Sequence, residues 1–409
     1  MIVDTNGILT LSSMARIKAF AALRPRPEVA GQVASVPYDV ISAGEARALA
    51  KGRPHSFLHI IRPEIDLSPG IDEHDSAVYS KGAENLHSFA MSGYSCREAT
   101  PALYLYRLRM GAHEQVGVYG LVSVEEYKRG IILKHENTRP PKVADRTKHI
   151  LAQCAHAEPV ILMFRDDASI TSLMEEAATG APLFDFTAED GIQHTIWKFS
   201  DHEPLVEAFA DVKSLYIGDG HHRCEAAWQA WSDQRLPDSD FFPAVCFPVS
   251  NMYIMPYNRV VHVPDVGALI EKIDALGVLE KASGREVPTA REEVSLYADG
   301  AWHTIKLPPT GRSGVADSLD VARLGEFILE PFLGIIDQRT DPRITFVGGS
   351  RGVEGLVNHV DQTPGTVAFS MFETSMEQLL DVSDAGELMP PKSTWFEPKL
   401  RSGLLIHQF

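Results

Sequence analysis

One short segment, Asp219-Gly220-His221-His222-Arg223, constrains the fold of this chain more than any other. It follows an apolar, strand-like stretch, Ser214 to Ile217, and precedes a stretch with a helical pattern, Cys224 to Trp231. A strand that turns through glycine into a helix leaves the first N–H groups of the helix pointing outward. Because these donors, the helix dipole, two imidazoles and a guanidinium converge, the segment predicts a site for phosphate or another oxyanion. The alternative is a capped helix whose histidines happen to be exposed.

The size and composition of the chain bound the remaining possibilities. Its 409 residues are too many for one ordinary core, so two or three packed lobes are expected. With 44% hydrophobic and 23% charged residues it has the composition of a globular protein. The net charge of −17 argues against a dedicated nucleic-acid partner, while a local basic pocket for a small anion remains compatible with it.

Cysteine usage and hydropathy indicate a cytoplasmic protein. The four cysteines form no CxxC pair and no metal-binding spacing, so reduced thiols are expected. The N-terminus lacks the basic and apolar regions of a signal peptide, and no run of 18 apolar residues suggests a membrane span. Residues 1–15 are expected to form a loose extension, and Met14 could be a natural start.

Periodicity divides the remaining chain into three expected lobes of mixed α/β structure, residues 16–124, 125–262 and 263–409. Two capping boxes, Ser42 with Glu45 and Thr374 with Glu377, predict helix starts. In the last lobe, a strand, a glycine turn, a helix and a strand predict a parallel βαβ unit. Strands are expected at 36–41, 101–110, 115–124, 159–164, 194–197, 242–249, 343–347, 366–371 and 404–406, and helices at 43–51, 169–178, 321–333, 353–360 and 375–382.

A second charged cluster, Lys134 to Arg139, is followed by Lys142, Asp145 and Arg146. Pro140-Pro141 forbids a continuous helix, so a structured loop that enters a helix near residue 143 is expected. Charge runs are usually solvated faces, but this one lies between apolar stretches and could line a cleft instead.

Two further segments are weaker candidates. The turn Gly348 to Gly352 lacks the spacing of a Walker A loop or a Rossmann fingerprint, so close packing of helix on strand is its simpler role, although Arg351 could contact a phosphate or a partner subunit. The proline-rich run from Met389 to Gly403 carries Lys392, Lys399 and Arg401, and either a functional loop or a packed tail would explain it. No HExxH or G-x-S-x-G motif occurs.

The segments 219–223, 134–139 and 392–403 resemble a bacterial family labelled as domain of unknown function number 1015, or as ParB-like proteins. The resemblance covers nearly the whole chain, including 36–42, 55–64 and 343–352. It implies a multi-lobed protein with a nucleotide-binding core of the ParB/sulfiredoxin-like fold, in which a loop like 219–223 holds nucleotide phosphates. That fold includes the free-serine kinases, although this chain is much longer than the minimal ones.

The resemblance therefore implies a phosphotransferase that moves a phosphoryl group between ATP or ADP and a small hydroxyl metabolite such as L-serine, with Mg²⁺ brought by the nucleotide. Glu136 would be the base that takes the hydroxyl proton, with Asp219 as its rival or as a Mg²⁺ ligand. A non-catalytic nucleotide-binding regulator and a metal-dependent phosphohydrolase are the alternatives. The candidate residues are Glu136, Asp219 and His135 for catalysis; Gly220, His221, His222, Arg223 and Arg139 for the phosphates; and Lys142, Arg146, Arg351, Lys392, Lys399 and Arg401 for the substrate or a second anion.

Overall fold

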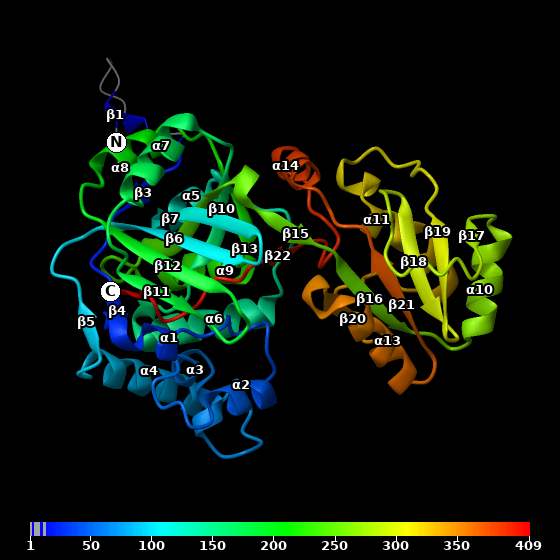
Figure 1. Cartoon of the computed structure of the whole chain (residues 1–409), viewed down its shortest axis with the longest axis horizontal. Helices are drawn as coiled ribbons and strands as arrows, with labels where there is room; N and C mark the ends of the chain where they lie inside the picture. Colours follow the sequence, from blue (N-terminus) through cyan, green and yellow to red (C-terminus); the bar gives the residue numbers. More distant parts are fainter. Residues whose placement is uncertain (1, 4–8, 11–13) are drawn as a thin grey trace. The chain divides into compact units, whose positions relative to one another are not determined.

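The structure, a computed structural model, describes residues 2–3, 9–10 and 14–409, which form two compact units (Figure 1). Unit 1 combines Met1–Leu133, Thr138–Met252 and Pro398–Phe409, and unit 2 combines Lys134–Asn137 and Tyr253–Glu397. Most of the extension expected over residues 1–15 lies outside the described residues, apart from the paired strands β1 (Ile2–Val3) and β2 (Leu9–Thr10) and residues 14–15.

Unit 1 is built on a mixed nine-stranded sheet. Strands β10 and β14 are parallel, as are β13 and β8, and the other neighbours are antiparallel. The strands predicted at 101–110, 115–124, 159–164 and 242–249 are confirmed to within two residues. Across the sheet the strands are β11 (Phe184–Thr187), β12 (Gln193–Phe199), β6 (Leu103–Met110), β7 (His113–Ser123), β14 (Phe241–Pro248), β10 (Val160–Phe164), β13 (Leu215–Asp219) and β8 (Ile132–Leu133), with β3 (Ile17–Lys18) beside β7.

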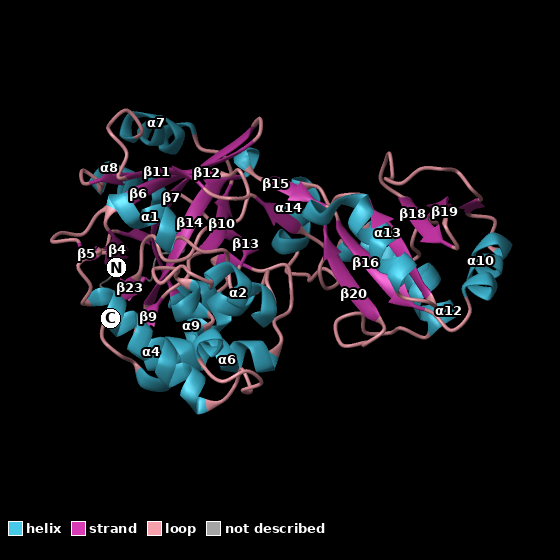
Figure 2. Cartoon of the chain, turned by 60° about the horizontal axis from the view of Figure 1, so that its bottom comes forward, coloured by secondary structure: helices cyan, strands magenta, loops and turns pink. Residues whose placement is uncertain are grey.

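Both faces of this sheet are covered, which explains the uninterrupted apolar run in β10. Leu162 and Phe164 pack with residues of the helices on one face, whereas Ile161 packs on the other face with Leu404 and Leu405 of the C-terminal segment. Helices α4, α6 and α9 cluster on one side of unit 1, and α7 and α8 lie on another (Figure 2). The helices are α1 (Ala30–Val33), α2 (Ala43–Ala50), α3 (Leu58–Ile61), α4 (Ser76–Ala90), α5 (Val124–Lys128), α6 (Pro140–Gln153), α7 (Ala168–Ala177), α8 (Glu203–Phe209) and α9 (His221–Gln234).

The C-terminal segment, residues 398–409, is an integral part of unit 1. Four of its apolar side chains are buried, and the Tyr119 hydroxyl donates a 2.7 Å hydrogen bond to the Leu405 carbonyl. The strand predicted at 404–406 lies further along the chain, where β23 (His407–Gln408) pairs with β9 (Ala155–His156). Nearer the N-terminus, β4 (Leu23–Pro25) pairs with β5 (Ser95–Arg97).

Unit 2 contains a six-stranded antiparallel sheet in the order β17-β19-β18-β21-β16-β20. The predicted βαβ unit is present in a split form, because β16 lies between β20 and β21 and is antiparallel to both. The elements are β15 (Tyr253–Met255), β16 (Tyr257–His262), α10 (Val266–Ala275), β17 (Leu279–Glu280), β18 (Glu293–Ala298), β19 (Ala301–Lys306), α11 (Asp320–Leu324), α12 (Glu330–Leu333), β20 (Ile344–Gly348), α13 (Gly352–Gln362), β21 (Thr366–Met371), α14 (Met376–Asp384) and β22 (Trp395–Glu397).

Two local predictions require correction. The capping box of α2, Ser42 with Glu45, is confirmed, but that of α14 is Ser375 with Gln378. Thr374 does not cap the helix, since its hydroxyl donates to the Ser393 carbonyl at 2.9 Å. The helix predicted over 321–333 is interrupted by a π-helical turn at Gly325–Leu329, between α11 and α12.

The three expected lobes differ from the two units of the structure. The boundary expected at 124/125 falls between strands of one sheet, because β7 pairs with β14. The boundary expected at 262/263 lies ten residues after the start of the long segment of unit 2, at Tyr253.

The four cysteines are free. Among residues 2–3, 9–10 and 14–409, no helix is long and apolar enough to cross a membrane.

Candidate functional site

The predicted strand-to-helix turn is present, and a single residue, Gly220, separates the strand from the helix. Asp219 is the last residue of β13, Gly220 is the N-cap of α9, and His221 is already in the helix. Gly220 has φ of +104°, and a Cβ there would lie 2.7 Å from Cγ1 of Val160. Only glycine fits this conformation and this spacing. Glycine has no side chain to cap α9, and the N-terminus of a helix is a position that favours an anion.

Asp219 lies between two cations. Its Oδ2 is 3.5 Å from Arg223 Nη2 and 3.5 Å from Lys399 Nζ of the C-terminal segment. A carboxylate with two cationic neighbours has a weak tendency to take up a proton or to attract a third cation. Asp219 therefore fits the role of holding Arg223 and Lys399 at the turn better than that of a base.

Arg223 connects the turn to the interior of unit 1. Its guanidinium donates to the Pro159 carbonyl, and the side chain is 10% exposed. Burial on its own lowers the pKa of Arg223, but the charges of Asp219 and Asp39 outweigh this effect and raise that pKa above its ordinary value. The guanidinium is therefore permanently charged and fixed in place.

A polar cavity of about 320 Å³ lies beside the turn. One hydrogen bond links the turn to the lining: the Arg139 backbone N–H donates to Nε2 of His222 at 3.0 Å, and Arg139 lines the cavity, whereas residues 219–223 do not. Arg139 is the N-cap of α6, which begins at Pro140, three residues before the start expected near residue 143, because proline is tolerated in the first turn of a helix. The cationic residues that line the cavity are Arg62, Arg139, Lys142 and Arg146, and the acidic ones are Asp39, Glu64, Glu73 and Asp145.

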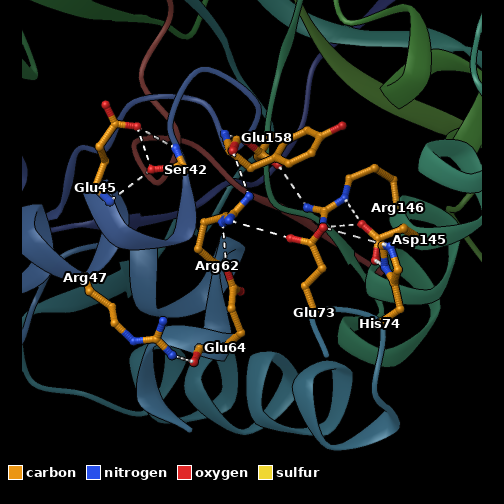
Figure 3. A network of polar contacts seen from close by, with 11 residues as sticks. Ser42, Glu45, Arg47, Arg62, Glu64, Glu73, His74, Asp145, Arg146 and Glu158 are labelled. Atoms are coloured by element: carbon orange, nitrogen blue, oxygen red, sulfur yellow. Dashed lines mark hydrogen bonds and ion pairs between the residues drawn. The ribbon is translucent and has the colours of Figure 1, made fainter. Parts of the chain in front are cut away.

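An ion-pair network holds one wall of this cavity (Figure 3). Asp145 of α6 accepts hydrogen bonds from Arg146 at 2.6 and 2.9 Å, from the Tyr79 hydroxyl at 2.9 Å and from His74 at 3.0 Å. Burial on its own raises the pKa of Asp145, but the charge of Arg146 and these bonds outweigh it and lower that pKa to about 2. Asp145 is consequently ionised at neutral pH. The Arg146 guanidinium lies 3.9 Å from the centre of the Tyr38 ring.

Glu158 also contacts this wall, through Arg146. Its Oε1 accepts from the Tyr38 backbone N–H and from the Ser402 hydroxyl, each at 3.2 Å, and Oε2 is 3.8 Å from Arg146 Nη1. Burial raises the pKa of this carboxyl against the opposing charges of Arg223 and Arg146. Glu158 thereby ties the cavity to the C-terminal segment.

The turn at Tyr38 and Asp39 corrects another expectation. Residues 36–41 were predicted to be a strand, but they form a turn, with the Val40 N–H donating to the Pro37 carbonyl at 3.4 Å. This turn places Asp39, which is exposed, on the cavity lining. Pro37 is the first residue of this turn, so the preference of proline for the second position gave no signal for it.

Several other lining residues were not predicted. Arg62 Nε lies 2.7 Å from Glu64 Oε1, and Arg62 Nη1 donates to the Tyr38 carbonyl at 3.3 Å. Glu73 Oε2 is 3.8 Å from Arg62 Nη2 (Figure 3). These residues lie far from α6 in the sequence, and only the packing of α4 against α6 brings the two regions together.

The predicted catalytic residues His135 and Glu136 belong to unit 2, whereas Asp219 and the turn belong to unit 1. Met389 N–H donates to the His135 carbonyl at 2.7 Å, and the His135 ring lies 3.3 Å from the Thr394 hydroxyl. The charge of Glu136 acts on Arg259, a fully buried cation whose pKa burial lowers to about 10. Within unit 2, Glu136 thus offsets a buried charge.

The remaining candidates are divided between the units. Arg351 and Lys392 lie in unit 2, where the Lys392 ammonium is 5.4 Å from the centre of the Tyr257 ring. Arg401 lies in unit 1, with a buried side chain that pairs with Asp190. In unit 1 the structure therefore brings together Asp219 to Arg223, Arg139, Lys142, Arg146 and Lys399, and it places Arg401 against a different partner.

The donor set fits an anion better than a resident metal ion. Within the part of the chain that the structure describes, no three His, Cys, Asp or Glu side chains are grouped closely enough to hold a metal. Asp219, the expected Mg²⁺ ligand, already lies 3.5 Å from each of two cations. The helix N-terminus, Arg139 and Lys142 instead offer donors and positive charge to phosphate oxygens.

The described residues thus form a mixed α/β protein in which a strand-to-helix turn borders a cavity rich in ion pairs. The family described as "Protein of unknown function (DUF1015)" matches residues 17–322, and the chain belongs to this family. A comparison with curated proteins finds no match.

Three solved structures show distant similarity. A conserved hypothetical protein from Pyrococcus furiosus aligns with 12% identity and a TM-score of 0.37, over 71% of this chain and 95% of that one. SbnI with a C-terminal truncation, from Staphylococcus aureus, aligns with 11% identity and a TM-score of 0.39, over 71% and 87%. A free serine kinase in complex with AMP aligns with 10% identity and a TM-score of 0.36, over 70% and 91%. Similarities this low support no conclusion about function.

Proposed function

We propose that this protein is a nucleotide-dependent phosphotransferase that acts on a small hydroxyl metabolite, with L-serine as the first acceptor to test. The observation that carries the proposal is the contact between the uncapped start of α9 and the cavity, through His222 and Arg139. The volume of the cavity, about 320 Å³, is at the lower end of the range for ligand pockets, about 300–1,000 Å³. That size suits a phosphate chain and a small acceptor.

The proposed roles follow from the positions of the residues. The N–H groups at the start of α9, together with Arg139 and Lys142, hold the nucleotide phosphates and stabilise charge as the phosphoryl group moves. Arg146 forms ion pairs with Asp145 and Glu158, so its role is to hold the cavity wall and not to bind the phosphates. The nucleotide supplies the transferable phosphoryl group and brings any Mg²⁺ with it.

The acceptor hydroxyl must lose its proton as the new O–P bond forms and the bond to the nucleoside diphosphate breaks. Asp39 is our preferred base, because it is an exposed carboxylate on the cavity lining. Glu136, the base expected from the sequence, is the rival. Asp219 is less suitable because of its two cationic neighbours.

The test is phosphorus NMR on the purified protein with Mg²⁺, with ATP and L-serine in one tube and O-phosphoserine and ADP in another. A new phosphomonoester matched by nucleotide turnover, in either direction, is the expected result. Free phosphate from O-phosphoserine alone would identify a phosphohydrolase. If both tubes stay unchanged, the serine assignment is wrong, and nucleotide binding without turnover would identify a regulatory protein.

The base is tested by comparing Asp39→Asn with Glu136→Gln, and Glu84→Gln, an exposed residue of α4, serves as the control. Loss of a general base lowers kcat by about 10²–10⁴-fold. Asp39→Asn is expected to show this loss, with nucleotide affinity retained. A few-fold effect of Asp39→Asn beside a large effect of Glu136→Gln would transfer the role to Glu136.

A further inference from the structure

A second cavity in unit 1, of about 790 Å³, lies at the other end of β10 from the turn at Asp219. The turn lies beside Val160, at the start of β10. The cavity is at the end of that strand, because Asp166 comes two residues after Phe164 and Pro248 pairs with Phe164, and both line the cavity. A strand rises about 3.3 Å per residue, so the length of β10 separates the two sites by about 13 Å. The second cavity is therefore distinct from the site proposed above.

The floor of this cavity is apolar. Val116, Met174 and Ala178 line it together with the ring of Trp197, whose indole N–H donates to the Gly180 carbonyl at 3.0 Å. That bond fixes the ring in one orientation. Because Trp197 is 6% exposed, the partly exposed Val116 and Ala178 provide most of the apolar surface for the hydrocarbon part of a ligand.

The rim of the cavity is acidic. Asp166, Asp167 and Glu175 line it from the start and middle of α7, and Glu114 lines it from β7. Among the described residues of the lining, Arg107 alone is a cation. It is already occupied, since its guanidinium lies 4.9 Å from the centre of the Trp197 ring and donates to the Thr195 hydroxyl at 3.1 Å.

The charge balance of the rim favours a cationic ligand. Arg107 Nε is 3.9 Å from Glu114 Oε2, which leaves three carboxylates in excess among the lining residues. An anion at the start of α7 is disfavoured, because Asp167 already accepts from the N–H groups of Ser169 and Ile170 at 2.8 and 3.1 Å. The Ser250 N–H donates to Asp166 at 3.2 Å and holds that carboxylate at the rim.

We propose that this cavity is a second ligand site, which binds a small organic cation: a primary ammonium on an apolar, preferably aromatic, body. The ammonium lies between Asp166 and Glu175, and the body packs on Val116, Ala178 and the exposed edge of Trp197. The Trp197 ring, the apolar floor and the excess of carboxylates carry this assignment together. It does not depend on the function proposed for the turn.

The test uses isothermal titration calorimetry with phenethylammonium chloride and two probes of similar shape, 2-phenylethanol and 3-phenylpropionate. We expect phenethylammonium to bind at least about ten-fold more tightly than the alcohol, a difference of about 1.4 kcal/mol, and the carboxylate to bind least. Inorganic phosphate, which competes for the turn at Asp219, is expected to leave this affinity unchanged.

Variants locate the ammonium. Glu175→Gln and Asp166→Asn are each expected to weaken phenethylammonium binding about 2–5-fold, as for a partly exposed ion pair. Glu176→Gln, the next residue of α7 and absent from the lining, is the matched control and is expected to leave the affinity unchanged. Circular dichroism verifies that the variants are folded. Equal affinity for the alcohol, unchanged affinity in both variants, or no binding at about 10 mM ligand would each overturn the proposal.

Discussion

Replacing Asp145 by asparagine tests the physical account of the cavity wall most directly. The change keeps the size of the side chain but removes the charge that faces Arg146 at 2.6 Å. The lowering of the Asp145 pKa from 3.8 to about 2 corresponds to about 2 kcal/mol of stabilisation. The buried Arg146 would keep only Glu158, 3.8 Å away. Since removing one partner of a buried pair costs about 3–5 kcal/mol, we expect Asp145→Asn to lower the unfolding free energy of unit 1 by about 2–4 kcal/mol.

The same pKa fixes the pH dependence of this effect. A carboxyl whose pKa is lowered in the folded state contributes stability above its unfolded pKa, near 3.9, and loses it as the pH falls toward 2. The difference between the wild type and Asp145→Asn should therefore be complete at pH 5–7 and shrink below about pH 4.

The assay is urea unfolding followed by circular dichroism at pH 7, 5, 4 and 3. The control is Glu84→Gln, which removes an exposed partner of Lys81 at 3.0 Å and should cost less than about 0.5 kcal/mol. A cost for Asp145→Asn below about 1 kcal/mol at pH 7, or a difference that does not change between pH 5 and 3, would refute the reasoning.

Three further substitutions test other parts of the fold by the same unfolding assay. Gly403→Ala should destabilise unit 1 by about 2 kcal/mol or more, because φ there is +88° and a Cβ would collide with the Phe57 ring; a cost within about 0.5 kcal/mol would contradict this. Lys399→Met removes one of the two cations beside Asp219 and should cost about 1–2 kcal/mol at pH 7; a cost within about 0.3 kcal/mol of zero would contradict this. Burial raises the pKa of Asp320 to about 6, so its ionisation costs stability that grows from about pH 4 and is complete above about pH 6. Asp320→Asn should therefore stabilise unit 2 by about 1 kcal/mol at pH 7 and by nothing at pH 4, and equal effects at the two pH values would exclude the explanation.

Local patterns in the sequence predicted much of the fold. The apolar run at 159–164 and the alternation at 101–110 depend on neighbouring residues, and both became strands of the unit 1 sheet. The turn at Gly220 was predictable for the same reason, since the change from strand to helix pattern occurs within a few residues. The capping box of α14 was misplaced by one residue because Thr374 and Ser375 are both good caps, and only the contact of Thr374 with Ser393 decides between them.

The candidate site was less predictable, because tertiary contacts assemble it. Arg146 was identified from its cluster, but Glu158 and Tyr38, which fix it, are distant in the sequence and had no recognisable motif. The neighbouring residues Glu136 and Arg139 were grouped as one segment, although the chain passes from unit 2 to unit 1 between them. Sequence proximity does not reveal such a crossing.

The order of segments in unit 1 has a consequence for synthesis. Residues 398–409 fill one face of its sheet with Leu404 and Leu405, yet they leave the ribosome after all of unit 2. During translation the nascent unit 1 must therefore wait with an open apolar face, in a state prone to aggregation. A chain truncated before residue 398 would lack the segment that completes its first unit. Unit 1 is thus completed only once residues 398–409, which follow all of unit 2 in the sequence, have been made.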